Sequence, residues 1–171
     1  MEKGYIQVYT GDGKGKTTAA IGLAVRAACY GMKVYIGQFV KDMKYHETKI
    51  TEYLPNIRIE QLGIGCFIDR PPDENDRAVA GKALANCAEI LKKGAYDVVI
   101  LDEITIAIYF QLITVEDVIK ALENRAEHVE VILTGRYAPE ELIDKADLVT
   151  EMREIKHYYT QGVLSRPGID W

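Results

Sequence analysis

Residues 10–18, TGDGKGKTT, constrain this chain more than any other segment, because glycine alternates with polar residues between an apolar run and a segment of helical period. Glycines let the backbone curl so that successive N–H groups point at phosphate oxygens, and the N-terminus of the following helix adds positive potential. Lys16 is placed to reach the outer phosphates of a nucleotide, and the Thr17 hydroxyl is placed to bind Mg2+. The segment therefore predicts a phosphate-binding loop.

The loop departs from the usual pattern G-x-x-x-x-G-K-[ST]. Thr10 occupies the first glycine position, so the loop is one residue short when it is counted from Gly11. The alternative interpretation is a tight glycine-rich turn in which Lys14 and Lys16 are merely solvated. A strand before the loop and a helix after it favour phosphate binding over that alternative.

A second element supports the first. Residues 98–101 form an apolar run that ends in Asp102 and Glu103, which resembles a Walker B strand. In open α/β sheets the ligand crevice lies at the carboxyl ends of the strands. A carboxylate there would hold Mg2+, or Mn2+, directly or through water and neutralise charge on a triphosphate. Helix capping by the two acidic residues is the alternative.

Short runs rich in Val, Ile and Tyr alternate with longer segments of helical period, as in parallel sheets covered by helices. We expect one α/β domain over residues 1–171, a three-layer sandwich of the P-loop NTPase (RecA-like) class with a mostly parallel central sheet. The expected strands are 5–9, 33–40, 56–62, 97–101, 129–134 and 148–152.

The helix signals are local. The expected helices run from within 15–17 to about 30, from 73 to about 93, from 114 to about 127, and briefly from 139. Gly31 and Gly94 mark two helix ends, and residues 114–117 read as a capping box. Residues 41–55 and 63–72 are expected to be irregular loops, and the tail from residue 156 to be irregular but docked.

Composition excludes several classes of function. The 26 acidic and 21 basic residues give a net charge of -5, which lacks the cationic face that nucleic acid requires. Cys29, Cys66 and Cys87 are widely spaced and odd in number, as expected of reduced thiols in a cytoplasmic protein. Apolar runs are too short to span a bilayer, and the first four residues do not read as a secretory signal. We therefore expect a cytoplasmic protein with no membrane partner.

A phosphate loop alone does not select a reaction, because the same fold carries ATPases, kinases and other transferases. None of the histidines, His46, His128 and His157, belongs to a recognisable nucleophile or metal motif, and each is expected to be a surface or satisfied side chain. A regulatory ATPase with a protein partner and a small-molecule or nucleoside kinase both remain open.

Seven stretches, in the same order and over nearly the whole chain, resemble the ATP:corrinoid adenosyltransferases of the CobA type. They are YTGDGKGKTTAA at 9–20, QFVK at 38–41, LDE at 101–103, TGR at 134–136, ADLVTE at 146–151, KH at 156–157 and GID at 168–170. The shortened phosphate loop is the form that this family uses.

The resemblance implies that residues 1–171 form one adenosyltransferase domain. Such an enzyme attaches the 5'-deoxyadenosyl group of ATP to the Co(I) of a reduced corrinoid, such as cobalamin or cobinamide, and releases triphosphate in cobalamin biosynthesis or salvage. ATP would lie in reversed orientation along the loop, which exposes C5'. Co(I) is itself the nucleophile, so positioning and charge stabilisation suffice. The resemblance further implies a homodimer, with a flavoprotein reductase as a candidate source of Co(I).

Site residues follow from the same resemblance. The implied ATP-binding residues are Gly11, Asp12, Gly13, Lys14, Gly15, Lys16, Thr17, Thr18, Arg26 and Arg136. The implied catalytic residues are Lys16, Thr17 and Glu103. The implied metal-site residues are Thr17, Asp102 and Glu103, with Glu103 favoured for direct ligation. Arg26 has a surface salt bridge as its alternative, and Arg136 has an ion pair with Asp144 or Glu140.

The corrinoid side departs from the family pattern. Relatives carry a Gly-Phe-x-Trp segment whose aromatic side chains press on the lower face of the corrin, whereas this chain has Gly65-Cys66-Phe67-Ile68. Phe67 and Ile68 are the corrinoid-binding candidates, and ordinary packing under a loop is the alternative for Phe67. Longer relatives also have a helix before the first strand that covers the site, so any cover here is expected from elsewhere. The D-x-H-x-x-G motif is absent, which favours an enzyme that modifies corrinoid.

Overall fold

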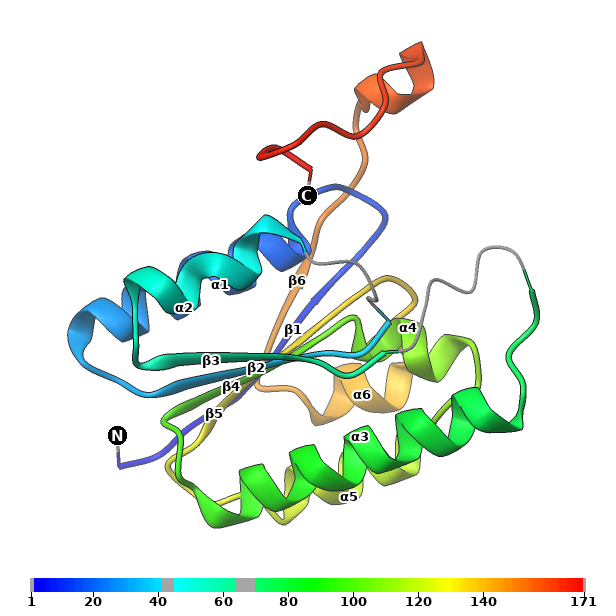
Figure 1. Ribbon diagram of the computed structural model, residues 1–171. Helices are drawn as coiled ribbons and strands as arrows, with labels where there is room; N and C mark the ends of the chain where they lie inside the picture. Colours follow the sequence, from blue (N-terminus) through cyan, green and yellow to red (C-terminus); the bar gives the residue numbers. More distant parts are fainter. Residues whose placement is uncertain (1, 41–44, 64–69, 171) are drawn as a thin grey trace.

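The computed structural model describes residues 2–40, 45–63 and 70–170. A six-stranded sheet runs through the middle of the molecule in the order β3-β2-β4-β5-β1-β6, and every neighbouring pair is parallel (Figure 1). The strands are β1 Ile6–Thr10, β2 Val34–Gln38, β3 Ile57–Gln61, β4 Val98–Asp102, β5 Glu130–Thr134 and β6 Leu148–Glu151. Their bounds differ from the expected ones by at most two residues, and the α/β prediction is confirmed.

Parallel neighbours need crossover connections, so helices cover both faces of the sheet. The α-helices are α1 Lys16–Tyr30, α2 Ile50–Tyr53, α3 Glu74–Lys93, α4 Ile104–Tyr109, α5 Val115–Glu123 and α6 Glu140–Lys145. Short 3-10 helices occupy His46–Lys49 and Tyr158–Gln161. α1 and α2 lie on one face, and the other four α-helices lie on the opposite face (Figure 1).

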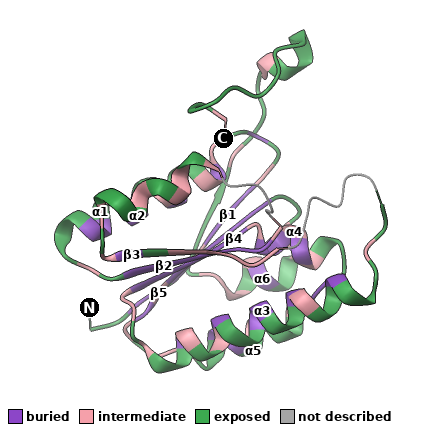
Figure 2. Ribbon diagram, in the orientation of Figure 1, coloured by how far each residue is buried: buried purple, intermediate pink, exposed green. Residues whose placement is uncertain are grey.

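Strand β4 shows how the two hydrophobic cores arise. Side chains alternate along a strand, so Val98 and Ile100 pack toward α1 while Val99 and Leu101 pack toward α3 and α5. All of these residues are buried, and the central strands of the sheet are largely purple in Figure 2. The same alternation places Asp102 on the α1 face, which is the face that carries the phosphate loop.

Local signals fix most helix ends. Asp73 caps α3 with a full capping box, because its side chain accepts from the Asp76 N–H at 3.0 Å while the Asp76 carboxylate accepts from the Asp73 N–H at 2.8 Å. Gly31 and Gly94 adopt the left-handed conformation after α1 and α3, as expected. At α5 the Thr114 hydroxyl accepts from the Asp117 N–H at 3.1 Å, which is one of the two contacts of a capping box.

Two expectations were wrong. Helix α5 ends at Glu123 rather than near residue 127, because the chain turns there and the Ala126 N–H donates to Leu91 O at 2.9 Å. Residues 46–53 are helical within a segment expected to be irregular. The apolar run at 104–109, for which the sequence predicted no element, forms the helix α4.

The tail and the described cysteines lie in different surroundings. The tail, residues 156–170, is mostly exposed, and its end returns to the phosphate loop (Figure 1), where Lys14 contacts Ile169 and Asp170. Cys29 is exposed and Cys87 buried, both as free thiols, and Cys66 lies outside the described residues. Within the described ranges, each helix is too short or too polar to cross a membrane.

The capping box of α3 is expected to contribute to the stability of the fold. Asp73→Ala should lower the free energy of unfolding by about 1 kcal/mol, because the Asp76 N–H at the start of α3 loses its acceptor and the capping box is broken. Urea denaturation measures the change. The control is Asn75→Ala at a neighbouring exposed position, which should stay within about 0.5 kcal/mol of the parent. Equal losses in the two variants would contradict the role given to the cap.

Candidate functional site

The phosphate loop lies against the chain that follows β6. The Gly13 N–H donates to Met152 O at 2.7 Å. A Cβ atom added to Gly13 would lie 2.7 Å from that oxygen and 2.8 Å from the carbonyl carbon of Arg153, which real Cβ atoms do not approach so closely. At the end of the loop, Gly15 has φ 120°, a conformation that L side chains rarely adopt. The loop therefore needs glycine for close approach as well as for its turn.

Lys16 is folded into the loop. Its side chain is buried, and its Nζ donates to Gly11 O and Gly13 O, each at 2.7 Å. Burial, then the charge of Arg136, holds the pKa of Lys16 below its ordinary value, while Glu103 and Asp12 oppose the shift. Phosphate oxygens in the loop could replace the two carbonyls as acceptors and would restore favourable charge pairing for this cation.

Asp102 joins three elements beside the loop. The residue is 1% exposed. Oδ1 accepts from the Thr17 hydroxyl at 2.8 Å and from the Thr134 hydroxyl at 2.7 Å, and Oδ2 accepts from Gln38 Nε2 at 3.1 Å. The carboxylate thus connects the start of α1 to the ends of β5 and β2. A buried carboxylate is stable only with such partners.

Glu103 follows directly and has a different environment. Its backbone is left-handed, with φ 60°, and its N–H donates to the Thr134 hydroxyl at 3.1 Å. This conformation is uncommon for a residue other than glycine. The turn ends β4 and begins α4, so the side chains of Asp102 and Glu103 face different surroundings. Glu103 lines the cavities described next, whereas Asp102 is buried behind Thr17.

Two adjoining cavities open at the carboxyl ends of β1 and β4. Their volumes are about 440 and 320 Å3, a size typical of small-molecule sites. The residues common to both are Thr17, Thr18, Glu103, Ile169 and Asp170. The larger cavity is also lined by Ile21, Tyr45, His46, Glu47 and Gly168. The smaller is also lined by Gly13, Lys14, Gly15, Lys16, Arg136 and His157. Together they form one cleft over the phosphate loop.

Most of the predicted site residues come together in this cleft. Gly11 and Asp12 belong to the same loop, and Arg136 Nη2 donates to Asp12 O at 3.4 Å. Among the described residues, Arg136 forms no ion pair with Asp144 or Glu140, which removes that alternative. Phe67 and Ile68 lie outside the described residues.

Arg26 is not brought to the cleft. It lies on α1 roughly three turns, or about 15 Å, beyond Lys16. Its side chain is exposed and lines neither cavity.

Several lining residues received no role from the sequence. Tyr45, His46 and Glu47 precede or begin a 3-10 helix in a segment expected to be irregular. His157 accepts from the Tyr159 N–H at 3.1 Å and also lines the smaller cavity. A signal existed for His157 and residues 168–170, because both belong to stretches that resemble the family. No comparable signal marks residues 45–47.

The similarity to known proteins extends over nearly the whole chain and includes the residues that line the cleft. The chain matches the model of the family ATP:corrinoid adenosyltransferase BtuR/CobO/CobP over residues 2–171. A corrinoid adenosyltransferase of Escherichia coli strain K12 is 34% identical over 170 residues, 99% of this chain and 87% of the relative. One from Salmonella typhimurium is 35% identical with the same coverage. One from Sinorhizobium is 37% identical over 174 residues, 99% of this chain and 81% of the relative.

The contact between Gly13 and Met152 can be tested with two glycines. Gly13→Ala should lower the free energy of unfolding by about 1–3 kcal/mol, because the added Cβ overlaps backbone atoms. Gly22→Ala is the matched control in α1, where an added Cβ meets nothing within 4 Å. It should raise the free energy of unfolding by about 0.5–1 kcal/mol. Changes of the same sign, measured by urea denaturation, would show that the loop does not depend on this approach.

Proposed function

Because the chain belongs to the family of ATP:corrinoid adenosyltransferases, we propose that it transfers the 5'-deoxyadenosyl group of Mg-ATP to the Co(I) of a reduced corrinoid and releases triphosphate. The observation that carries this proposal is the cleft over the phosphate loop. Lys16 lies inside the loop, and the Thr17 hydroxyl donates a hydrogen bond to Asp102. The chain matches the family over nearly its full length.

The finer fold assignment is part of the proposal. We assign the domain to the P-loop NTPase class of RecA-like topology. Strands β1 and β4 both neighbour β5, so the strand before the phosphate loop and the strand ending in Asp102 are separated by one strand. The hydrogen bond from Thr17 to Asp102 then links the loop to that carboxylate. These relations support the class.

The triphosphate would lie in the smaller cavity. Loop N–H groups, Lys16 and Arg136 provide the positive potential that a polyanion requires. Lys16 and Arg136 repel each other, and this repulsion contributes to the lowered pKa of Lys16 after burial. A bound triphosphate would relieve the repulsion. The position of Arg26 gives no support to its expected contact with ATP.

Oxygen donors in the cleft fit Mg2+, with Mn2+ as a substitute. The Thr17 hydroxyl and Glu103 line both cavities, and hydroxyl, carboxylate, water and phosphate oxygens are the ligands that Mg2+ prefers. Asp102 has both carboxylate oxygens engaged by protein donors, which favours Glu103 for direct contact. Among the described residues, no cluster of three acidic, His or Cys side chains could hold a metal alone. When bound, Mg2+ would neutralise charge on the triphosphate.

The transfer itself needs no protein base. The electron pair of Co(I) forms the new Co–C bond at C5' of ATP, and the C5'–O bond breaks with its electrons leaving on triphosphate. Lys16, the loop N–H groups and Arg136 would stabilise the charge on that leaving group. Reversed ATP along the short loop would expose C5' to the corrinoid. Phe67 and Ile68 as corrinoid contacts, a homodimer, and a flavoprotein reductase supplying Co(I) complete the proposal.

Product analysis tests the reaction. Protein incubated anaerobically with Mg-ATP and borohydride-reduced cobalamin or cobinamide should give a light-sensitive Co–C product and inorganic triphosphate in equal amounts. Absorbance spectra and ion chromatography identify the two products. Phosphate and ADP without corrinoid would instead support a regulatory ATPase, and ADP with a phosphorylated acceptor would support a kinase.

Lys16 tests the assignment of the phosphate loop. Lys16→Ala should lower kcat/KM by about 100-fold or more, because charge on the departing triphosphate loses its buried cation. Lys82→Ala, at an exposed position on α3, is the control and should match the parent. Steady-state adenosylation rates give both values. Full activity of the Lys16 variant would contradict the proposed position of the triphosphate.

A further inference from the structure

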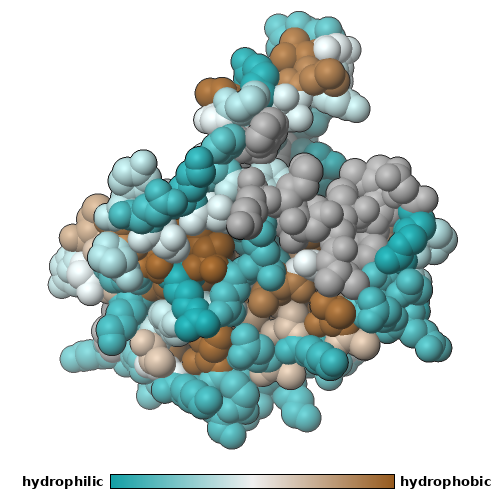
Figure 3. Space-filling model, in the orientation of Figure 1, coloured by the Kyte–Doolittle hydropathy of each residue, from teal (hydrophilic) through white to brown (hydrophobic). Residues whose placement is uncertain are grey.

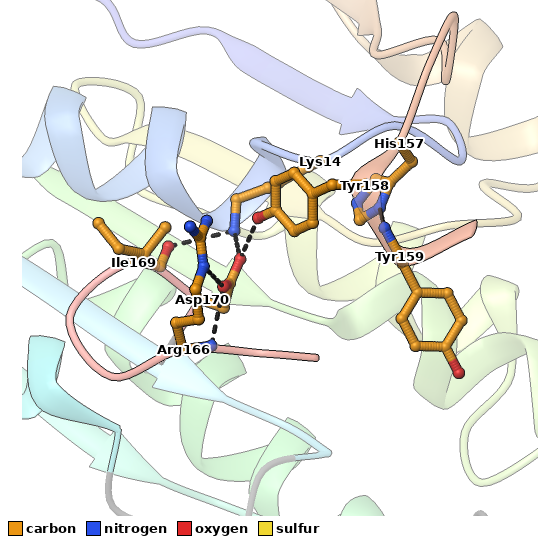
Figure 4. Close-up of polar contacts among 7 residues, drawn as sticks. All are labelled: Lys14, His157, Tyr158, Tyr159, Arg166, Ile169 and Asp170. Carbon is orange, nitrogen blue, oxygen red and sulfur yellow. Dashed lines mark hydrogen bonds and ion pairs between the residues drawn. The ribbon is translucent and has the colours of Figure 1, made fainter. Parts of the chain in front are cut away.

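The end of the tail is joined to the phosphate loop through Lys14. Lys14 Nζ donates to Ile169 O at 3.1 Å and forms an ion pair with the Asp170 carboxylate (Figure 4). The two partners lie at opposite ends of the chain. A lysine of a phosphate loop is thus engaged by the protein's own carboxylate.

Asp170 organises residues 166–170, which we term the tail loop. Its Oδ1 accepts from Lys14 and from the Tyr158 hydroxyl, the latter at 2.6 Å. Its Oδ2 accepts from the Arg166 N–H at 2.9 Å and the Arg166 Nε–H at 3.5 Å. The Arg166 guanidinium also lies 4.8 Å from the centre of the Tyr158 ring. Both carboxylate oxygens therefore have protein donors, and Asp170 serves to hold the tail loop in place.

These charges reinforce one another. Lys14 and then the Tyr158 hydroxyl hold the pKa of Asp170 well below its ordinary value. Burial lowers the pKa of Lys14, but its contacts with Asp170 and Tyr158 more than compensate, so the pKa of Lys14 is raised. Both shifts favour the charged forms of Lys14 and Asp170 at neutral pH.

The tail loop borders the larger cavity with an apolar side chain. Ile169 is 60% exposed and lines both cavities, and the larger one is also lined by Gly168 and by Ile21 of α1. Figure 3 shows hydrophobic residues at the surface of the tail. When a ligand covers an exposed isoleucine beside a cavity, apolar surface is removed from water, and this favours binding. The smaller cavity differs, because Lys16 and Arg136 line it and make it suitable for phosphates.

We propose that Ile169 contacts the nucleoside of bound ATP and that the Lys14–Asp170 ion pair positions it there. This inference rests on the proposed function and adds a determinant of nucleoside binding to it. With the triphosphate in the smaller cavity, the adenosine extends into the larger one, where Ile21 and Ile169 provide apolar contact. Lys14 then acts as a positioning residue, which separates its role from that of Lys16.

The proposal predicts different effects on two ligands. Inorganic tripolyphosphate needs only the phosphate loop, whereas ATP also needs the tail loop. Ile169→Ala should raise the Kd for Mg-ATP about tenfold and leave the Kd for Mg-tripolyphosphate unchanged. Asp170→Asn should also raise the Kd for Mg-ATP about tenfold. It should not weaken the binding of tripolyphosphate, because Lys14 becomes free to contact that ligand. Isothermal titration calorimetry measures all four constants.

Two controls accompany the experiment. Ile169→Leu keeps the apolar volume and should bind ATP like the parent. Lys145→Ala removes an ion pair with Glu123, and the Lys145 side chain is about as exposed as that of Lys14, 37% against 39%. This variant should bind both ligands with the Kd of the parent. Equal weakening of both ligands by the tail variants, or an unchanged Kd for ATP, would overturn the inference. Failure of the parent protein to bind either ligand would contradict the proposed function itself.

Discussion

Asp102 lies buried at the end of β4 with hydrogen bonds from Thr17 and Thr134 on one oxygen and from Gln38 on the other. An unpaired carboxylate at this depth would cost several kcal/mol, so the three donors and the three elements that carry them must stay in register. The N-terminus of α1 is thereby held over the ends of the central strands. The arrangement of the phosphate loop, the cleft and Glu103 depends on this one buried group.

The loop is constrained from a second side by the chain after β6. Gly13 approaches Met152 so closely that a methyl group would not fit between them. The Lys16 side chain lies inside the loop and donates hydrogen bonds to two of the loop's carbonyl oxygens. In the proposed reaction, these contacts would preorganise N–H groups and a cation for the triphosphate. Preorganised charge is what a transfer requires when the nucleophile brings its own electron pair and the departing group is triphosphate.

Two lysines of the same loop have different surroundings. Lys16 is buried and its pKa is lowered by burial and by Arg136, which suits it to a ligand of opposite charge. Lys14 is partly exposed and already paired with Asp170. The cleft divides accordingly into a smaller cavity lined by Lys16 and Arg136 and a larger one lined by Ile21, and Ile169 borders both. A nucleotide has the same division between its phosphates and its nucleoside.

Sequence by itself determined what depends on neighbouring residues. Apolar runs located the strands, Asp73 and Gly94 located the ends of α3, and glycine spacing located the loop between β1 and α1, because these effects act within a few residues. Tertiary structure alone decided that Asp102 is buried while Glu103 lines the cleft, that Arg26 lies away from it, and that α5 stops at Glu123. It also brought Asp170 to Lys14, 156 residues apart. Such contacts depend on how the whole sheet and its helices pack, and no local pattern encodes them.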